Sequence, residues 1–301
     1  MATAEPGGDP AVRSMLALRK GGPTVRRILL GAQLRRLREA KGITLEEAGH
    51  KIRASHSKMS RLELGRVGFK DRDVADLLTE YDVLDEKERD MLRALARQAN
   101  AQGWWHVYSD IMANWFEAYV GLEEAAASVR TYEVQFVPGL LQTEGYARAV
   151  TMLGYADSPA EEIERRVSLR MARQRLLEGD DPLNLWAVVD EAALRRPLGS
   201  QAVMREQISH LMDVTAVPHV TLQVIPFHSG GHAAAGGPFS ILRFAEPDLP
   251  DIVYLEQLTS ALYLDKREDV DHYLAVMERL CLEAEPATDT TEVLGRILKE
   301  L

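Results

Sequence analysis

Residues 42–65 run GITLEEAGHKIRASHSKMSRLELG, and the periodicity of their apolar residues predicts two short helices joined by a tight turn. Thr44 is followed three residues later by Glu47, which predicts a capping box at the start of the first helix. Ser55 is placed to cap the second helix in the same way. Gly49 is small where the two helices would approach each other closely. These features together predict a helix-turn-helix.

Helices on either side complete a compact helical domain. Apolar periodicity predicts a helix over Ile28–Lys41, and Gly42 ends it. Further helices are expected near Asp71–Tyr81 and Asp85–Ala99, before a domain boundary at Gly103. The expected fold of this part is therefore mainly α, with five helices.

The whole chain is expected to contain a tail and two domains. Residues 1–22 are rich in Gly, Pro and Ala with little periodicity, which predicts a disordered tail. Residues 23–102 would form the helix-turn-helix domain, and residues 103–301 a second domain that binds an effector or partner and dimerises. In the second domain, helices are expected at Thr143–Leu153, Pro159–Leu177 and Gln201–Ala216, and strands at Leu183–Val189, Val220–Phe227, Phe239–Phe244 and Ile252–Leu255. This order favours an α+β fold with a small, mainly antiparallel sheet.

Charge is distributed unevenly along the chain. Residues 24–66 hold 11 Lys or Arg against four Glu, whereas the whole chain has a net charge of −10. A basic segment on an acidic body is expected when one part of a protein contacts phosphate and the rest does not. The acidic total is therefore compatible with binding to double-stranded DNA.

Composition also predicts the compartment. The single cysteine, Cys281, excludes an internal disulfide and a Cys-rich zinc site, which fits a reducing cytosol. No apolar run approaches the roughly 20 residues that a membrane helix needs. The first residues also lack the apolar core of a signal peptide. We expect a cytoplasmic, nucleoid-associated protein without membrane contact.

The helix from His56 onward has the pattern of a DNA recognition helix. In a helix-turn-helix the first helix of the pair crosses the phosphate backbone, and the second enters the major groove. Met59 and Leu62 face the core, which leaves His56, Ser57, Ser60 and Arg61 facing outward. The side chain of Arg61 has the geometry to contact guanine through two hydrogen bonds. Positive charge for phosphate contacts would come from Arg36, Arg53, Lys58 and Arg66.

Residues 28–66 resemble the Xre family of helix-turn-helix regulators, which includes the lambdoid phage repressors. The resemblance implies a lambda-repressor-like domain, with base-facing roles for Ser55, His56, Ser57 and Arg61. It also implies a partly buried ion pair between Arg38 and Glu63 near a phosphate, and a phosphate contact at Thr44 with the helix N-terminus. The sequence departs from the family at Leu45, where many members carry a phosphate-binding Gln.

Motifs in the second domain resemble a narrower group. They are Gly103-Trp104-Trp105, the run QFVPGLLQT at residues 135–143, and Gly237-Pro238-Phe239 followed by Val253-Tyr254-Leu255-Glu256. These motifs are similar to those of actinobacterial Xre regulators resembling WhiJ, which are described as antitoxin-like or developmental regulators. In that group the gene often neighbours one for a small BldB-like protein. The resemblance therefore implies a small BldB-like protein partner.

Several features of the second domain leave alternatives open. Aromatic residues step along a helical face from Tyr108 through Met112, Trp115 and Tyr119 to Leu122, either in the core or in a partner groove. A basic series is interpreted as a solvated helix face, and alternatively as a dock for an acidic partner. Its members are Arg165, Arg166, Arg170, Arg173 and Arg175.

The sequence predicts neither a metal site nor an active site in the second domain. His219, His228 and His232 invite a metal interpretation, but no carboxylate lies nearby at ligand spacing. The loop Gly230–Gly237 lacks the Gly-Lys-Ser/Thr of a phosphate-binding loop. No Ser–His–Asp or Cys–His arrangement is evident, so we expect no cofactor and no enzymatic activity.

The function predicted from the sequence is that of a sequence-specific DNA-binding transcriptional regulator. A homodimer is expected, because one recognition helix contacts only a few base pairs, whereas two helices about 34 Å apart contact a palindrome. An antitoxin-like adaptor, which sequesters a small partner protein and uses DNA binding for autoregulation, is the alternative. A small-molecule sensor is the third hypothesis.

Overall fold

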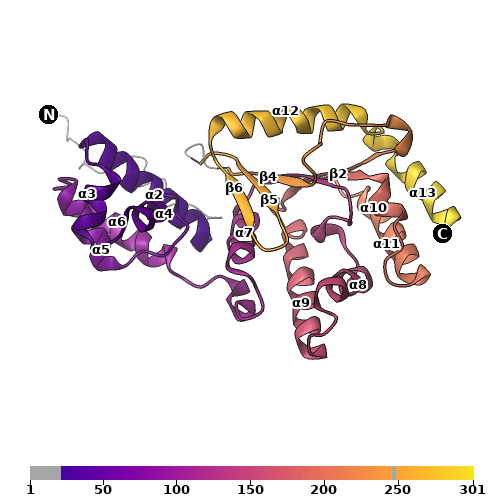
Figure 1. Ribbon diagram of the computed structural model, residues 1–301, viewed down its shortest axis with the longest axis horizontal. Coiled ribbons are helices and arrows are strands. Elements are labelled where there is room, and N and C mark those ends of the chain that lie inside the picture. The colour runs from indigo at the N-terminus through magenta and orange to yellow at the C-terminus, as the bar shows by residue number, and fades with distance from the viewer. Residues whose placement is uncertain (1–21, 246–248) are drawn as a thin grey trace. The chain divides into compact units, whose positions relative to one another are not determined.

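The computed structural model describes residues 22–245 and 249–301, and they form two compact units (Figure 1). One unit ends at His106 and the other covers Val107–Leu301. The tail predicted for residues 1–22 lies outside the described residues, apart from Gly22. Each unit is described by itself below.

The first unit is helical, as predicted. Its helices are α2 (Pro23–Ala40), α3 (Leu45–Lys51), α4 (His56–Glu63), α5 (Asp71–Glu80) and α6 (Glu86–Ala99). The first of these starts five residues before the predicted Ile28, with Pro23 in its first turn. Proline favours that position because its φ is already helical and its missing N–H would have no partner there.

Local capping signals determine where α2, α3 and α4 begin or end. The predicted capping box is confirmed, since Glu47 N donates to the Thr44 hydroxyl and the Glu47 carboxylate accepts from Thr44 N. The predicted cap at Ser55 is also confirmed, because its hydroxyl accepts from Lys58 N. Gly42 ends α2 with a φ of 68°, a left-handed conformation that glycine adopts without steric cost.

A close backbone contact sets the position of α4. A Cβ atom on Gly31 of α2 would lie 2.5 Å from the carbonyl oxygen of Glu63, so only glycine fits at this crossing. Around it, Leu30, Leu34 and Met59 are fully buried. This packing holds the second helix of the helix-turn-helix against α2.

The second unit contains a six-stranded mixed sheet with the order β3-β2-β1-β4-β5-β6. The strands are β1 (Ser128–Glu133), β2 (Asn184–Asp190), β3 (Val220–Ile225), β4 (Phe239–Arg243), β5 (Ile252–Glu256) and β6 (Ala261–Leu264). The pairs β1–β2 and β2–β3 are parallel, and the other three pairs are antiparallel. The predicted α+β class with a mainly antiparallel sheet is therefore only partly correct.

The difference has a structural cause. The polar strand β1, SVRTYE, was not predicted, and it lies next to β2 and β4 inside the sheet. The helices α8 (Glu144–Tyr155) and α9 (Ala160–Arg173) separate β1 from β2, while α10 (Glu191–Arg195) and α11 (Gln201–Val214) separate β2 from β3. Crossovers that contain helices return the chain in the same direction, which makes these strands parallel.

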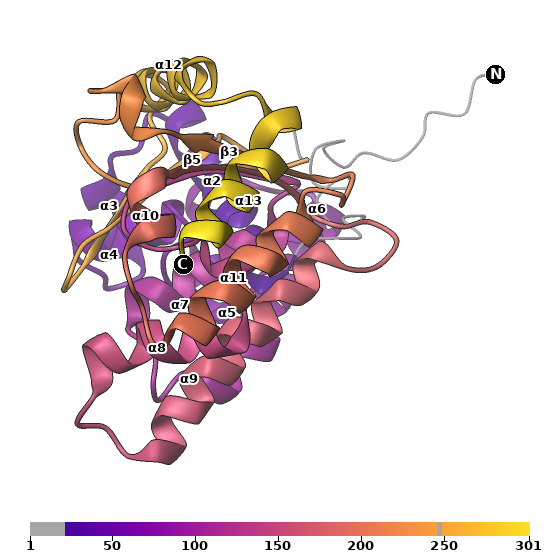
Figure 2. The same ribbon diagram turned by 90° about the vertical axis from the view of Figure 1, so that its right-hand side faces the viewer.

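Helices cover both faces of the sheet. One face packs on α12 (Arg267–Glu283), where Met277 and Leu280 contact a core that includes Tyr132 and Val253. On the other face Tyr254 packs on Tyr119 of α7 (Asn114–Ala125), with ring centroids 4.2 Å apart. Figure 2 shows α13 (Thr290–Glu300) alongside α11 at one side of the unit.

The aromatic series is not one helix. Trp104–Tyr108 forms a 3₁₀ turn, and α7 begins only at Asn114, so the prediction of a helical face starting at Tyr108 is wrong. Between the two elements, Asp110 accepts hydrogen bonds from the Arg165 guanidinium at 2.6 and 2.7 Å, which holds this segment against α9. Trp115, Tyr119 and Leu122 do lie in α7, and Tyr119 and Leu122 are buried in the core.

Within residues 22–245 and 249–301, every helix is too short or too polar to cross a lipid bilayer.

Candidate nucleic-acid interface

Helix α4 presents its polar face to solvent. The side chains of Ser55, His56, Ser57 and Arg61 are exposed, and those of Met59 and Leu62 are buried on the opposite side. Ser60, which faces the same side as His56, is half-buried. Ser55, His56 and Ser57 therefore lie at the start of α4, where a recognition helix contacts the major groove, and Arg61 lies exposed in its last turn.

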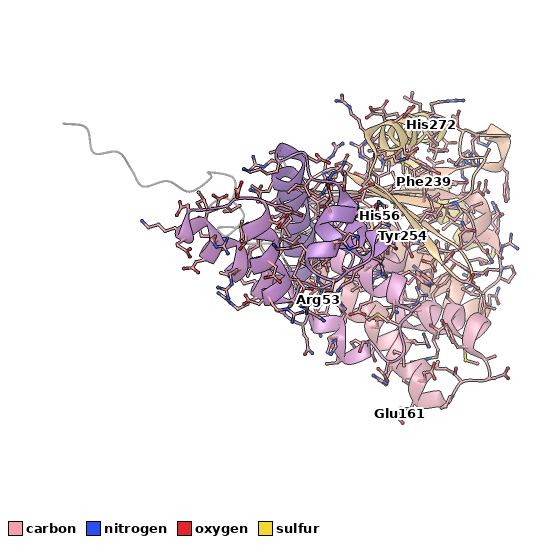
Figure 3. All side chains as sticks on the ribbon, turned by 60° about the vertical axis from the view of Figure 1, so that its left-hand side comes forward. Arg53, His56, Glu161, Phe239, Tyr254 and His272 are labelled. Carbon is pink, nitrogen blue, oxygen red and sulfur yellow. The ribbon has the colours of Figure 1, made fainter. Side chains whose placement is uncertain are left out.

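The turn between α3 and α4 contains a residue in the left-handed conformation. Arg53 has a φ of 55°, and its side chain is exposed (Figure 3). On the inner side of the turn, Ala54 N donates to Gly49 O at 2.8 Å, and a Cβ atom on Gly49 would lie 2.8 Å from Ala54 O. The predicted close approach at Gly49 is present, whereas no sequence signal indicated the conformation of Arg53.

The ion pair between Arg38 and Glu63 is present and buried. Arg38 Nε donates to Glu63 Oε1 at 2.6 Å, and Arg38 Nη2 donates to Glu63 Oε2 at 2.8 Å. A further bond from Arg38 Nη1 to Ile43 O measures 2.8 Å. The hydrogen bonds to Glu63 raise the pKa of Arg38 above its ordinary value despite burial. These bonds engage the Arg38 guanidinium inside the protein, and the ion pair therefore positions α4 against α2. A contact between Arg38 and a DNA phosphate stays a prediction.

The other predicted phosphate contacts differ in how accessible they are. Arg36, Thr44, Arg53 and Arg66 are exposed. Lys58 is half-buried, with its Nζ atom 3.8 Å from Asp73 Oδ2. Thr44 N and Thr44 Oγ1 each donate to Glu47 Oε2 at 2.8 Å, so the capping box already supplies an anion at the start of α3. A phosphate at Thr44 would have to compete with that carboxylate.

A hollow of about 510 Å³ lies between α2, α3 and α4. Thr44 and Leu45 line one side of it, and His56 and Ser60 line the other. The carboxylates of Glu39 and Glu46 also border the hollow, and sequence analysis did not include them. The structure thus brings Thr44 and His56 to one concave surface of mixed charge.

In the second unit the three histidines have different partners. His219 Nε2 is 2.9 Å from Leu177 O, and His228 Nε2 is 3.7 Å from Glu285 Oε1. His232 Nε2 is 3.0 Å from the Tyr132 hydroxyl. No group of three potential metal ligands from His, Cys, Asp and Glu occurs in the part of the chain that the structure describes.

The basic series, which runs along α9 and into the 3₁₀ turn Gln174–Leu177 that follows it, is not a uniformly solvated face. Arg173 is buried and donates to Glu123 through two hydrogen bonds of 2.7 Å. Arg165 and Arg166 are paired with Asp110 and Glu162. The prediction of a solvated helix face is therefore wrong for Arg173, because α7 approaches α9 closely and supplies a buried partner.

The end of β1, close to Arg170, carries a carboxyl group with a shifted pKa. Burial, followed by the charge of Glu256, raises the pKa of Glu133 from 4.5 to about 8. Glu133 is thus mostly protonated in the folded state at pH 7, whereas it is ionised in the unfolded state. Unfolding then releases a proton between these two pKa values, so stability falls as the pH rises through that window.

Substitution Glu133→Gln tests this shift. We expect the free energy of unfolding to rise by about 1–3 kcal/mol at pH 7, because glutamine cannot ionise. The gain should shrink toward pH 4, where the carboxyl group is protonated in both states. Urea unfolding of both proteins from pH 4 to pH 9 measures the difference. If the difference in the free energy of unfolding between the two proteins does not change with pH, the raised pKa of Glu133 is contradicted.

Comparison with known families matches both units. A helix-turn-helix domain model matches residues 29–92, which covers α3, α4, α5 and most of α2. A second model, described as a domain of unknown function (DUF5753), matches residues 116–296. No curated protein and no solved structure matches the chain. The matched domain and the exposed face of α4 indicate a DNA-binding regulator, and the chain belongs to the DUF5753 family, with a helix-turn-helix domain ahead of the family's own domain.

Proposed function

We propose that this protein is a sequence-specific transcriptional regulator of the Xre type, which binds its operator DNA as a homodimer. The observation that carries the proposal is the exposed polar face of α4, with Ser55, His56 and Ser57 at its start and Arg61 in its last turn. Buried contacts with α2 hold the opposite side of this helix. A rigidly held helix with exposed polar side chains is what direct contact with base edges requires.

Charge supports the same function. Arg36, Arg53 and Arg66 are exposed in the segment that holds 11 Lys or Arg against four Glu. Contacts from such side chains to phosphates release counterions from DNA, so affinity should fall as the salt concentration rises. We propose roles at phosphates for these arginines, for Lys58 and for Thr44, and base contacts for the four residues of α4.

Substitution Arg61→Ala tests the proposed recognition face. We expect a loss of about 1–3 kcal/mol in binding to the operator and relaxed specificity at one position, because a bidentate contact to guanine is removed. Electrophoretic mobility shifts with DNA from immediately upstream of the protein's own gene, at two salt concentrations, measure the loss. Footprinting on the same DNA shows whether the site is a palindrome, as a dimer requires.

The matched control is Arg97→Ala. Arg97 is also an exposed arginine of the first unit, but it lies on α6 and pairs with Asp71 at 3.4 Å. We expect the control to bind the operator as the unchanged protein does. Equal binding by Arg61→Ala and the unchanged protein would show that the recognition face is assigned wrongly.

We further propose that the DUF5753 domain controls DNA binding through a small protein partner or ligand. The resemblance to WhiJ-like regulators supports a small BldB-like protein as the partner. In the alternative, the protein is an antitoxin-like adaptor, neither enzyme nor dedicated regulator, whose main activity is to sequester that partner. Co-purification of a small protein whose removal leaves operator binding unchanged would favour the adaptor.

A further inference from the structure

A pocket of about 370 Å³ lies at one edge of the mixed sheet. It is bordered by Tyr132 near the end of β1, by Asp190 at the end of β2 and by Ile225 at the end of β3. These three strands are parallel, so their carboxyl ends meet at this edge. Open sheets of α/β proteins bind ligands just outside the carboxyl ends of their parallel strands. The loop after β3, with His232 and several glycines, closes the other side of the pocket.

The hydrogen bonds of His232 define its tautomer. Ala234 N donates to His232 Nδ1 at 3.3 Å, so Nδ1 acts as an acceptor. In the neutral ring the proton then lies on Nε2, which is 3.0 Å from the Tyr132 hydroxyl and 3.6 Å from Asp190 Oδ2. The imidazole therefore donates to the Tyr132 oxygen, and the phenol's own proton is free to be donated to another group.

The carboxylate of Asp190 supplies a hydrogen-bond acceptor next to the Tyr132 donor. Its Oδ1 atom accepts from Ala192 N at 2.8 Å and caps α10. Its Oδ2 atom faces His232 and keeps capacity to accept a hydrogen bond. Burial and the nearby charge of Asp190 raise the pKa of Tyr132 above its ordinary value, so the phenol stays protonated at neutral pH. The pocket thus offers a hydrogen-bond donor, the Tyr132 hydroxyl, and an acceptor, Asp190 Oδ2, and both lie close to His232 Nε2.

The surroundings of this pair are largely apolar, apart from the imidazole of His232. Val134, Ile225 and Ala234 line the pocket, and Phe227 borders it with 59% of its surface exposed. None of the residues that line it is Lys or Arg. Two loop amides that would otherwise attract an anion already donate to carboxylates: Phe227 N to Glu191 at 2.8 Å and Ala233 N to Glu283 at 3.4 Å.

These features discriminate between classes of ligand. An anion such as a phosphate brings only acceptors and would be repelled by Asp190. An alkylamine brings only donors, which leaves the Tyr132 proton without an acceptor. A planar heterocycle with an acceptor beside an N–H donor satisfies both groups, and its ring can stack on Phe227. We propose that this pocket binds an uncharged heterocycle of the nucleobase type through paired hydrogen bonds to Tyr132 and Asp190.

This inference rests on the proposed function only for the consequence of binding, namely that the ligand alters DNA affinity. Binding itself is measured without DNA. Failure of the ligand test would therefore leave the DNA-binding proposal unaffected, and failure of the operator test would leave the pocket unaffected.

Calorimetric titration of the full chain with adenine, cytosine and uracil tests the proposal, with benzylamine and benzoate as comparators. We expect at least one of the three bases to bind with a dissociation constant below about 1 mM, a range accessible to small ligands. The two comparators, which carry only donors or only acceptors, should bind at least about tenfold more weakly.

Three variants place the binding in this pocket. Asp190→Asn keeps a good helix cap but changes the chemistry of the acceptor, and Tyr132→Phe removes only the hydroxyl. Each should weaken binding of the base by about tenfold or more. Phe227→Ala changes an exposed side chain, which leaves folding intact, and should weaken binding through lost stacking. His228→Gln is the matched control, because His228 lies on the same loop but outside the pocket lining.

The site is supported if His228→Gln binds the base with unchanged affinity and the three other variants bind it more weakly. The proposal is overturned if none of the three bases binds, or if benzylamine or benzoate binds more tightly than the bases. It is also overturned if Phe227→Ala and Asp190→Asn, each shown to be folded by circular dichroism, bind the base as the unchanged protein does.

Discussion

Substitution Glu123→Leu is expected to lower the free energy of unfolding of the second unit by about 3–5 kcal/mol, because it leaves the charge of Arg173 buried without a partner. The relative exposures of the two residues are only 1% and 5%. Both oxygens of Glu123 accept from the Arg173 guanidinium at 2.7 Å, which joins α7 to α9. The aromatic rings of Phe116 and Tyr119 lie 5.3 and 5.5 Å from the guanidinium carbon and keep water away from it.

Urea unfolding followed by tryptophan fluorescence measures this effect, since Trp115 and Trp186 lie in the second unit. A matched control is Glu164→Leu, which breaks the exposed pair with Arg148 at 2.8 Å. Exposed pairs contribute about 0–1 kcal/mol, so the control should be nearly neutral. The double substitution Glu123→Leu with Arg173→Leu should recover part of the loss, because no buried charge remains. Equal losses in Glu123→Leu and Glu164→Leu would contradict the buried pair.

Substitution Arg38→Met is expected to have an effect of similar size on the first unit, about 3–5 kcal/mol, because it leaves Glu63 buried without its partner. Glu63 is 5% exposed, and both of its oxygens bind Arg38. The substitution also removes the bond to Ile43 O, at the turn that leads from α2 to α3. Since the pair holds α4 against α2, operator binding should be lost at temperatures where the unchanged protein still binds.

Thermal unfolding monitored by circular dichroism at a helical wavelength measures the stability of this variant, and mobility shifts measure DNA binding. The control is Arg35→Met on the same helix, which breaks an exposed pair with Glu39 at 2.8 Å. We expect the control to retain its unfolding temperature within the small change typical of exposed pairs. If Arg38→Met unfolds at the same temperature as Arg35→Met, the ion pair does not position α4.

Local signals explain why much of the first unit could be predicted from the sequence. A cap joins residues that are at most three positions apart, as Thr44 joins Glu47 and Ser55 joins Lys58. Burial of Met59 and Leu62 follows from helical periodicity alone. The polar face of α4 therefore follows from the sequence, although the roles of its residues at DNA remain predictions.

The second unit was predicted less well because its determining contacts are not local. Periodicity identified the strands β2, β3, β4 and β5, but it carried no information on their neighbours. Strand β1 has a polar sequence and no flanking turn signal. It nevertheless pairs with β2 on one side and with β4 on the other. The residues of β4 are more than 100 positions away from those of β1 in the sequence. The helices α12 and α13 were also not predicted.

The sequence by itself determined the helix-turn-helix, its caps and the exposed start of α4, since each depends on interactions within one or two helical turns. Only the tertiary structure decided the order of the strands, the burial of Arg173 and the pocket that contains Tyr132, Asp190 and His232. Arg173 and Glu123 are 50 positions apart, and Tyr132 and His232 are 100 positions apart. Pairs so far apart are brought together by the topology of the chain, and not by local propensity.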